Sequence, residues 1–220
     1  MPSSNTIIEP DFYTTAPKGV TIHSARMKLL DFNPQALLNM INDVSREASY
    51  LASAEVNIMI YGCSTCSLLG GIDWEKVLVN QIMFETGIKV VTINQAVVEA
   101  IRRLRGRKIG VVTPYDENLN CLERDYLKAN GITVSSCKGL GLHNPLDIAK
   151  VETDEILKIV DEVTPGCDTL YIGCTNLPVI HLIEGIESEF GLPVVTSNQA
   201  AIWYALRGFK ITGYGQLFMK

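Results

Sequence analysis

The sequence shows the same pattern twice: an apolar run that ends in Gly-Cys and continues into hydroxyl-bearing residues. The first copy ends at Gly62-Cys63 and the second at Gly173-Cys174, 111 positions further along a chain of 220 residues. Each apolar run has the length and composition of a buried β-strand, and hydroxyl residues suit the start of a helix. The pattern therefore predicts two strand-to-helix turns, each carrying one thiol at its tip.

A second repeat indicates that the architecture is duplicated. Residues 90–96 match residues 194–200 at an offset of 104, and each copy runs into a helical pattern and then Arg-Gly-x-Lys-Ile. Strand and helix patterns alternate, which is typical of parallel sheets built from βαβ units. We therefore expect an α/β protein with two pseudo-symmetric lobes, each a parallel sheet flanked by helices. The expected lobes are residues 1–92 with 197–220, and residues 93–196.

Hydrophobic periodicity, with the positions of glycine and proline, predicts the individual elements. Expected helices cover residues 34–54, 74–85, 116–130 and 153–163, and a further helix ends at residue 190. Expected strands cover residues 19–23, 90–92, 108–112, 132–134 and 193–196, and two more strands lead into the cysteines at 63 and 174. Ligands bind beyond the carboxyl ends of parallel strands. The site is therefore expected between the lobes, where both thiols lie.

Composition argues against several classes of function. The formal net charge is −5, and the longest basic cluster, residues 102–108, ends a helical pattern where positive charge complements the helix dipole. A nucleic-acid partner is therefore not expected. No stretch approaches the roughly 20 apolar residues of a membrane span, and the first residues lack a signal-peptide pattern. We expect a cytoplasmic protein without a membrane partner.

The six cysteines are expected to be free thiols, because reducing cytosol disfavours disulfides. Cys63 and Cys66 form a C-x-x-C motif, so a dithiol redox role is an alternative. That role does not explain the matching Gly-Cys-Thr in the second half. A structural zinc site would require a second closely spaced pair of Cys or His, which is absent from the sequence, so no metal is expected.

The position of the two thiols suggests their chemistry. A thiol just ahead of a helix faces unpaired amides and the positive end of the helix dipole, and both favour the thiolate. The alternative, that Cys63 and Cys174 are simply small buried hydrophobic residues, is less economical for two cysteines in matched contexts. Neighbouring hydroxyls and amides can hold a carboxylate without a basic side chain. These candidate ligands are Ser64, Thr65, Thr175 and Asn176.

At these residues the sequence resembles the aspartate/glutamate racemase superfamily, in particular its branch of maleate cis-trans isomerases and arylmalonate decarboxylases. The resemblance covers nearly the whole chain. It is carried by residues 2–9, 61–65, 112–116, 139–144, 173–176 and 213–217. Racemases of the superfamily carry Cys-Asn-Thr and Gly-Cys-Thr-Glu where this chain has Cys-Ser-Thr and Gly-Cys-Thr-Asn, and the similar decarboxylases lack the first cysteine. Both departures favour an isomerase.

The resemblance implies a cofactor-free reaction in which the Cys63 thiolate adds to an alkene carbon of maleate, the new single bond rotates, and elimination gives fumarate. Cys174 would be the opposing acid/base. Asn5, Tyr115 and Asn144 match positions that hydrogen-bond the substrate carboxylates. Alternatives are a racemase or decarboxylase of an amino acid, a hydantoin or an arylmalonate, and a non-catalytic small-ligand-binding protein.

Two further expectations concern the assembly and the start of the chain. A homodimer or a higher homo-oligomer is common among compact α/β enzymes and is expected here. Members of the branch usually carry a strand before the Pro-Ser-Ser-Asn stretch, with which this sequence begins. The first lobe is therefore expected either to manage without this strand or to have lost it from the start of the given sequence.

Overall fold

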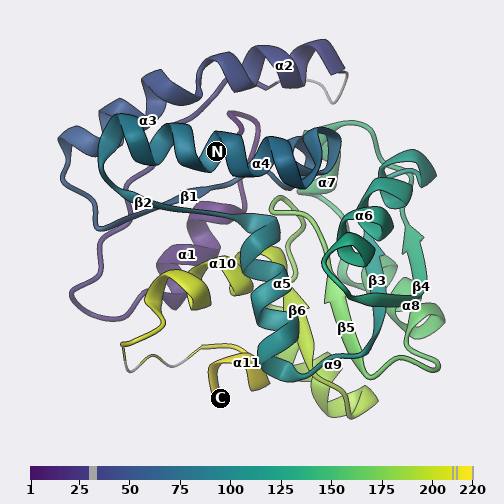
Figure 1. Ribbon diagram of the computed structural model, residues 1–220. Coiled ribbons are helices and arrows are strands. Elements are labelled where there is room, and N and C mark those ends of the chain that lie inside the picture. Colours follow the sequence, from purple (N-terminus) through teal and green to yellow (C-terminus); the bar gives the residue numbers. More distant parts are fainter. Residues whose placement is uncertain (30–33, 210, 212, 220) are drawn as a thin grey trace.

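The protein has an α/β architecture with two parallel sheets flanked by helices, as seen in a computed structural model that describes residues 1–29, 34–209, 211 and 213–219 (Figure 1). This confirms the predicted fold class. The strands are β1 (Ile58–Tyr61), β2 (Lys89–Thr92), β3 (Lys108–Thr113), β4 (Thr133–Gly139), β5 (Thr169–Ile172) and β6 (Val194–Thr196).

The helices lie on both sides of the sheets, and none in the described parts combines the length and the hydrophobicity needed to cross a membrane. They are α1 (Ile8–Thr15), α2 (Pro34–Asn42), α3 (Val44–Ser53), α4 (Ser64–Thr86), α5 (Ile93–Leu104), α6 (Glu117–Ala129), α7 (Pro145–Ile148), α8 (Thr153–Val163), α9 (Ile183–Phe190), α10 (Ser197–Leu206) and α11 (Gln216–Met219), with a 3₁₀ turn at Ile180–Leu182.

The two sheets place the strand ends that carry the site. One sheet pairs β1 with β2, and the other has the order β4-β3-β5-β6, with every pairing parallel. Parallel pairing brings the carboxyl ends of neighbouring strands to one edge. Cys63, Tyr115 and Cys174 each lie two residues beyond the end of a strand, after β1, β3 and β5. The chain leaves the first sheet at residue 92 and the second at residue 196, and the proposed lobe boundaries there stay a prediction.

The repeated sequence at residues 90–96 and 194–200 forms two matching helix starts. Thr92 accepts a hydrogen bond from the Gln95 backbone, the Gln95 side chain accepts one from the Thr92 backbone, and Thr196 and Gln199 repeat both bonds. Each pair is a capping box, which satisfies N–H groups at the start of a helix. The cap is threonine in both helices, because threonine is the last strand residue and its hydroxyl reaches the third residue of the helix.

A close approach of other groups explains why glycine precedes each cysteine. A Cβ added at Gly62 would lie 3.2 Å from the Ile8 side chain, and one at Gly173 would lie 3.1 Å from the Tyr171 hydroxyl. Both separations are tighter than ordinary van der Waals contact, so a larger residue would push these groups apart. The repeated Gly-Cys therefore reflects crowding at both strand ends.

Three expected elements differ in the structure. The helix predicted over residues 34–54 is divided at Asp43, whose N–H donates to the Met40 carbonyl three residues back, as in a 3₁₀ turn. The helix predicted from residue 74 is preceded in α4 by a helical segment that begins at Ser64, and the two segments meet at Gly71, whose φ of +73° and ψ of 178° are not helical. Glycine tolerates that conformation, so the Gly-Gly pair separates the two segments.

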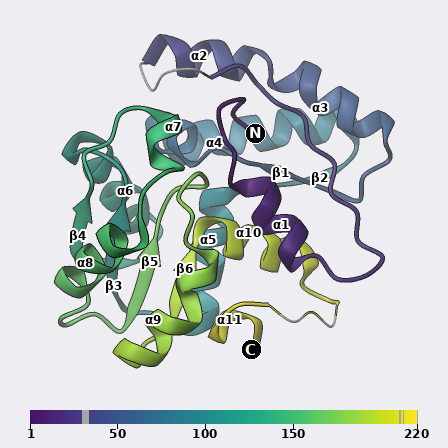
Figure 2. The same cartoon turned by 180° about the vertical axis from the view of Figure 1, so that it is seen from behind.

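The strand predicted over residues 19–23 does not form. This segment runs irregularly past β1, and a cavity of about 460 Å³ separates the two. The segment is instead held by contacts such as the Tyr13 hydroxyl donating to the Ile22 carbonyl. Figure 2 shows the N-terminal segment crossing this face, with α1 beside α10. An alternating pattern alone could not ensure pairing, because a strand also requires an accessible partner edge.

Candidate active site

The structure brings the two cysteine-bearing turns together around Tyr115. The side chains of Cys63 and Cys174 are buried, at 3% and 5% exposure, and Tyr115 is buried beside them. The Tyr115 hydroxyl shares a 3.0 Å hydrogen bond with the Ser64 hydroxyl and also lowers the pKa of the Cys174 thiol. Tyr115 therefore connects the turn after β1 with the turn after β5, across the two sheets.

The environment of Cys63 favours its thiolate. The sulfurs of Cys63 and Cys66 lie 3.4 Å apart, within hydrogen-bond reach of each other. When Cys63 is ionised it can only accept, so Cys66 is then the donor, and this hydrogen bond is the largest cause of a lowered pKa of Cys63. Burial opposes this effect, and the backbone amides of Thr65 and Cys66 support it. Unpaired amides at the start of a helix carry partial positive charge, which stabilises an anion. Cys63 is therefore the better nucleophile of the two.

The environment of Cys174 has the opposite effect. Burial, together with a charge on Cys63, raises the pKa of Cys174 to about 11. The Asn176 backbone N–H, 3.4 Å from the Cys174 sulfur, and the Tyr115 hydroxyl only partly oppose this. Cys174 is therefore a protonated thiol when Cys63 is a thiolate. Two like groups with divergent pKa values can divide the roles of nucleophile and acid between them.

The backbone of Cys174 is strained, whereas that of Cys63 is not. Cys174 has φ of +98°, in the left-handed region that non-glycine residues rarely adopt, whereas Cys63 is extended with φ of −134°. The Cys174 N–H donates to the Ser197 hydroxyl at 3.0 Å, which holds this conformation in place. Such strain persists only where surrounding contacts enforce it, and it clusters at functional sites.

This strain predicts opposite responses to glycine at the two cysteines. Cys174→Gly is expected to be more stable than Cys174→Ala by about 1 kcal/mol, because glycine adopts a positive φ without steric cost. Cys63→Gly should be less stable than Cys63→Ala by about 0.5–1 kcal/mol, because extended backbone gains nothing from glycine. Urea unfolding of the four variants gives both differences. The same sign at both positions would contradict a strained Cys174.

Asn5 and Thr175 meet at the wall of the site. The Asn5 amide nitrogen donates to the Thr175 hydroxyl at 2.9 Å, while the Asn5 amide oxygen accepts from the backbone N–H groups of Ile7 and Ile8 at the start of α1. Both side chains are buried. The side chain of Asn5 thus links α1 to the turn after β5.

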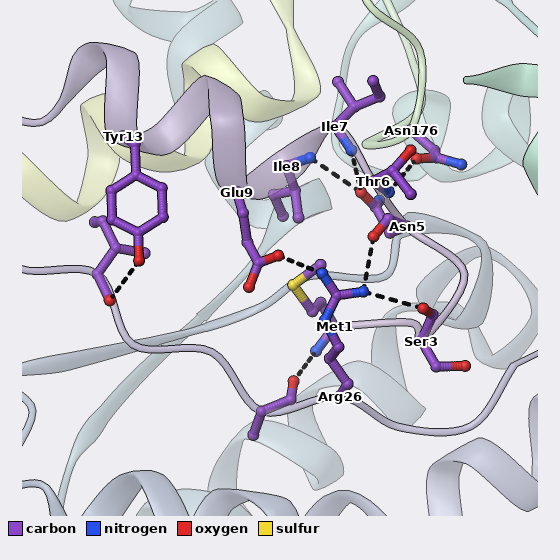
Figure 3. Close-up of polar contacts among 12 residues, drawn as sticks. Met1, Ser3, Asn5, Thr6, Ile7, Ile8, Glu9, Tyr13, Arg26 and Asn176 are labelled. Carbon is purple, nitrogen blue, oxygen red and sulfur yellow. Dashed lines mark hydrogen bonds and ion pairs between the residues drawn. The ribbon is translucent and has the colours of Figure 1, made fainter. Parts of the chain in front are cut away.

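Arg26 holds the segment that carries Asn5. Its guanidinium donates to the backbone carbonyls of Ser3 at 3.0 Å and Asn5 at 2.9 Å, and it pairs with the Glu9 carboxylate (Figure 3). A guanidinium presents several donors in a fixed plane, so it can hold two carbonyls and a carboxylate at once. The loop before α1 is therefore anchored by Arg26.

The two other asparagines predicted for the site have different surroundings. The Asn176 amide accepts from the Thr6 backbone at 2.9 Å and donates to the Pro145 carbonyl at 2.7 Å, so both ends of it hold the protein together. Asn144 is exposed and caps α7 by accepting from the Leu146 backbone. Among the described residues, no hydrogen bond joins the Asn144 side chain to either cysteine turn. Its role as a carboxylate ligand stays a prediction.

Sequence reasoning missed a pair of asparagines that support the two turns. The Asn94 amide donates to the Ser64 carbonyl at 3.2 Å, and the Asn198 amide donates to the Thr175 carbonyl at 3.0 Å. Each bond ends on the residue that follows a site cysteine. Asn198 also donates to the Asp11 carboxylate at 2.7 Å. The shared Asn-Gln-Ala of the repeat was the available signal, and it marks the support of both cysteine turns.

No group of three His, Cys, Asp or Glu side chains suited to hold a metal ion occurs in residues 1–29, 34–209, 211 and 213–219. The expected lack of a metal and of a cofactor stays a prediction. The dithiol alternative also stays open, since Cys63 and Cys66 are free and close together. A peptide that loses two hydrogens after mild oxidation would reveal their disulfide.

Comparison with known proteins places this geometry in a family. The sequence profile of the family described as arylmalonate decarboxylase matches residues 2–218. The chain belongs to this family. Relatives of this chain carry the names of both a maleate isomerase and an arylmalonate decarboxylase.

Two proteins with similar sequences and one similar crystal structure show what this chain resembles. Maleate isomerase of Alcaligenes faecalis is 26% identical over 97% of this chain and 89% of its own, and arylmalonate decarboxylase of Bordetella bronchiseptica is 26% identical over 83% and 78%. The crystal structure of an alanine variant of maleate isomerase from Pseudomonas putida S16 with maleate has a TM-score of 0.93 and 25% identity, covering 99% of this chain and 94% of its own.

Proposed function

We propose that this protein is a cofactor-independent cis-trans isomerase that converts maleate to fumarate. The observation that carries the proposal is the pair of buried thiols with divergent pKa values, lowered at Cys63 and raised at Cys174, joined through Tyr115. The similarity to maleate isomerases supports the choice of substrate. Cytoplasmic location and a homo-oligomer stay predictions from the sequence.

Addition is the first half of the proposed reaction. The Cys63 thiolate forms a carbon–sulfur bond to one alkene carbon, and the π electron pair moves to the other carbon, where the adjacent carboxylate delocalises it. The Cys174 thiol gives its proton to that carbon, which leaves a succinyl group on Cys63 and a thiolate on Cys174. The former double bond is then single, and rotation about it is fast on the scale of turnover.

Elimination is the second half of the reaction. The Cys174 thiolate removes a proton from the carbon that it protonated, the electron pair re-forms the double bond, and Cys63 leaves as thiolate. The raised pKa of Cys174 suits this step, because a thiolate of high pKa is a strong base. The trans product is released, and both thiols return to their starting states, so no cofactor or net proton is consumed.

The proposed carboxylate ligands belong to both turns. Ser64 and Thr65 form the first residues of α4, where free N–H groups and the helix dipole favour an anion. Thr175 and Tyr115 contribute buried hydroxyls near Cys174. A substrate dianion between the turns would then have one carboxylate near each sulfur, which aligns the alkene carbons with the thiols. Asn5, Asn144 and Asn176 complete the proposed set.

Proton NMR of maleate incubated with the protein tests the proposal. Conversion of the maleate vinyl signal into the fumarate signal is expected. No conversion is expected in a control that contains maleate in buffer without the protein. A protein whose Cys63 reacts with iodoacetamide but which leaves maleate unchanged would overturn the choice of maleate. Decarboxylation of phenylmalonate, followed in the same instrument, would then indicate the second candidate.

Decarboxylation is the second candidate because the family profile carries that description. Loss of carbon dioxide from an arylmalonate leaves a carbanion that needs one proton, which Cys174 alone could supply. Cys63 would have no covalent role in that reaction, although the structure favours its thiolate. A thiolate beside the substrate is what addition to an alkene requires, so the isomerase is the better supported of the two.

A further inference from the structure

Cys66 lies next to Cys63, the proposed nucleophile. It is in the first turn of α4, three residues after Cys63, a spacing that places two side chains on the same face of a helix start. Its side chain is 1% exposed, and the two sulfurs are 3.4 Å apart. A disulfide would require about 2.05 Å, so this separation is that of a hydrogen bond between free thiols.

A buried thiolate needs compensating donors. Cys63 is almost fully removed from water, and an unpaired anion in such surroundings is costly. The start of α4 supplies amides, and Cys66 has its sulfur 3.4 Å from that of Cys63. Once Cys63 is a thiolate, Cys66 carries the only proton of the pair and is the donor. Cys66 itself stays protonated, because its hydrogen bond to Cys63 and its burial both raise its pKa. The two sulfurs therefore share one proton, which Cys66 retains.

We propose that Cys66 is a positioning residue, whose S–H group holds the Cys63 sulfur in its reactive, ionised form. The inference rests on the proposed role of Cys63 as nucleophile and extends it to a residue outside the proposed set of substrate contacts.

Other titratable groups face this pair, and they define the background of any pH measurement. Tyr61, at the end of β1, has a buried hydroxyl that interacts with the Cys66 thiol, and burial raises the pKa of Tyr61 well above the usual range. Tyr115 and Cys174 face Cys63 from the ends of β3 and β5. The Met1 amino group also acts on Cys63, and burial lowers its pKa to about 6. These groups are unchanged in the variants below.

The test compares Cys66→Ala and Cys66→Ser with the parent and with Cys137→Ala, a matched thiol deletion elsewhere. Iodoacetamide labelling of Cys63 is measured against pH by peptide mass spectrometry. Cys66→Ala is expected to raise the midpoint of labelling by about one pH unit, which is about tenfold slower labelling at neutral pH. Cys66→Ser keeps a donor, so its labelling midpoint should lie much closer to that of the parent. Cys137→Ala should have the same midpoint as the parent.

Two outcomes would overturn the proposal. An unchanged midpoint in Cys66→Ala, with the fold verified by circular dichroism, would mean that the helix amides alone ionise Cys63. An equal shift in the alanine and serine variants would mean that packing of the sulfur matters and proton donation does not. Labelling requires no turnover, so failure of the maleate reaction in the parent would refute the proposed function and leave this result standing.

Discussion

Cys174→Ser incubated with maleate is expected to stop at a covalent adduct on Cys63. Addition needs only a proton donor, which a serine hydroxyl or water can supply. Elimination needs a base that removes a carbon-bound proton, and a neutral hydroxyl is far weaker in this role than the Cys174 thiolate. Loss of such a group lowers a rate by about a hundredfold to ten-thousandfold. Intact-protein mass spectrometry should show a gain of one maleate, with little fumarate formed.

Cys63→Ala is the matched control for this result. It removes the nucleophile and keeps the acid, so neither fumarate nor a mass gain is expected. Both variants should remain folded, because each replaces a buried thiol by a smaller side chain, a methyl group in Cys63→Ala and a hydroxymethyl group in Cys174→Ser, at a cost typical of removing a few buried atoms. An adduct that also forms in Cys63→Ala would place the nucleophile on another cysteine. Undiminished turnover in Cys174→Ser would remove Cys174 from the mechanism.

Glu123→Gln is expected to stabilise the protein at alkaline pH. Glu123 on α6 is 1% exposed, and its Oε2 has no hydrogen-bond partner among the described residues. Burial raises its pKa to about 8. A carboxyl with a raised pKa in the folded state costs stability once the pH exceeds its unfolded value, and the cost grows until the pH passes the folded value.

The pH window of the Glu123 effect follows from these two values. Between pH 6 and 9 the parent should lose about 3 kcal/mol of unfolding free energy relative to Glu123→Gln, at 1.36 kcal/mol for each pH unit of unequal ionisation. Urea unfolding at the two pH values measures the difference. Near pH 4 the two proteins should be equally sensitive to pH. A parallel pH dependence of both proteins would show that Glu123 is ionised at little cost.

Glu75 provides the contrasting control. It is equally buried, but its two oxygens accept from the Thr92 hydroxyl at 2.5 Å and the Tyr126 hydroxyl at 2.6 Å. Glu75→Gln replaces one acceptor by a donor that would face a hydroxyl, so it should destabilise the protein by about 1–3 kcal/mol. The two substitutions are identical in chemistry, and their opposite effects would separate a partnered from an unpartnered carboxyl.

Much of the architecture was predictable because it depends on local patterns. Apolar runs, glycine stops and the duplicated residues 90–96 and 194–200 predicted the parallel α/β class, which the structure confirms. The failures lie where a local pattern was ambiguous. Residues 19–23 alternate like a strand but pair with no edge, and the continuous helix expected over residues 34–54 is divided at Asp43.

The sequence by itself determined that the two thiols and Tyr115 follow parallel strands, which places each of them at the carboxyl edge of a sheet. Only the tertiary structure decided how these groups differ. The lowered pKa of Cys63, the raised pKa of Cys174 and the strained backbone of Cys174 are invisible in two matching Gly-Cys turns. The physical reason is the separation along the chain of the groups that interact. Strand and helix patterns depend on neighbours in the chain, whereas burial, hydrogen bonding and charge depend on groups that folding brings from far along it.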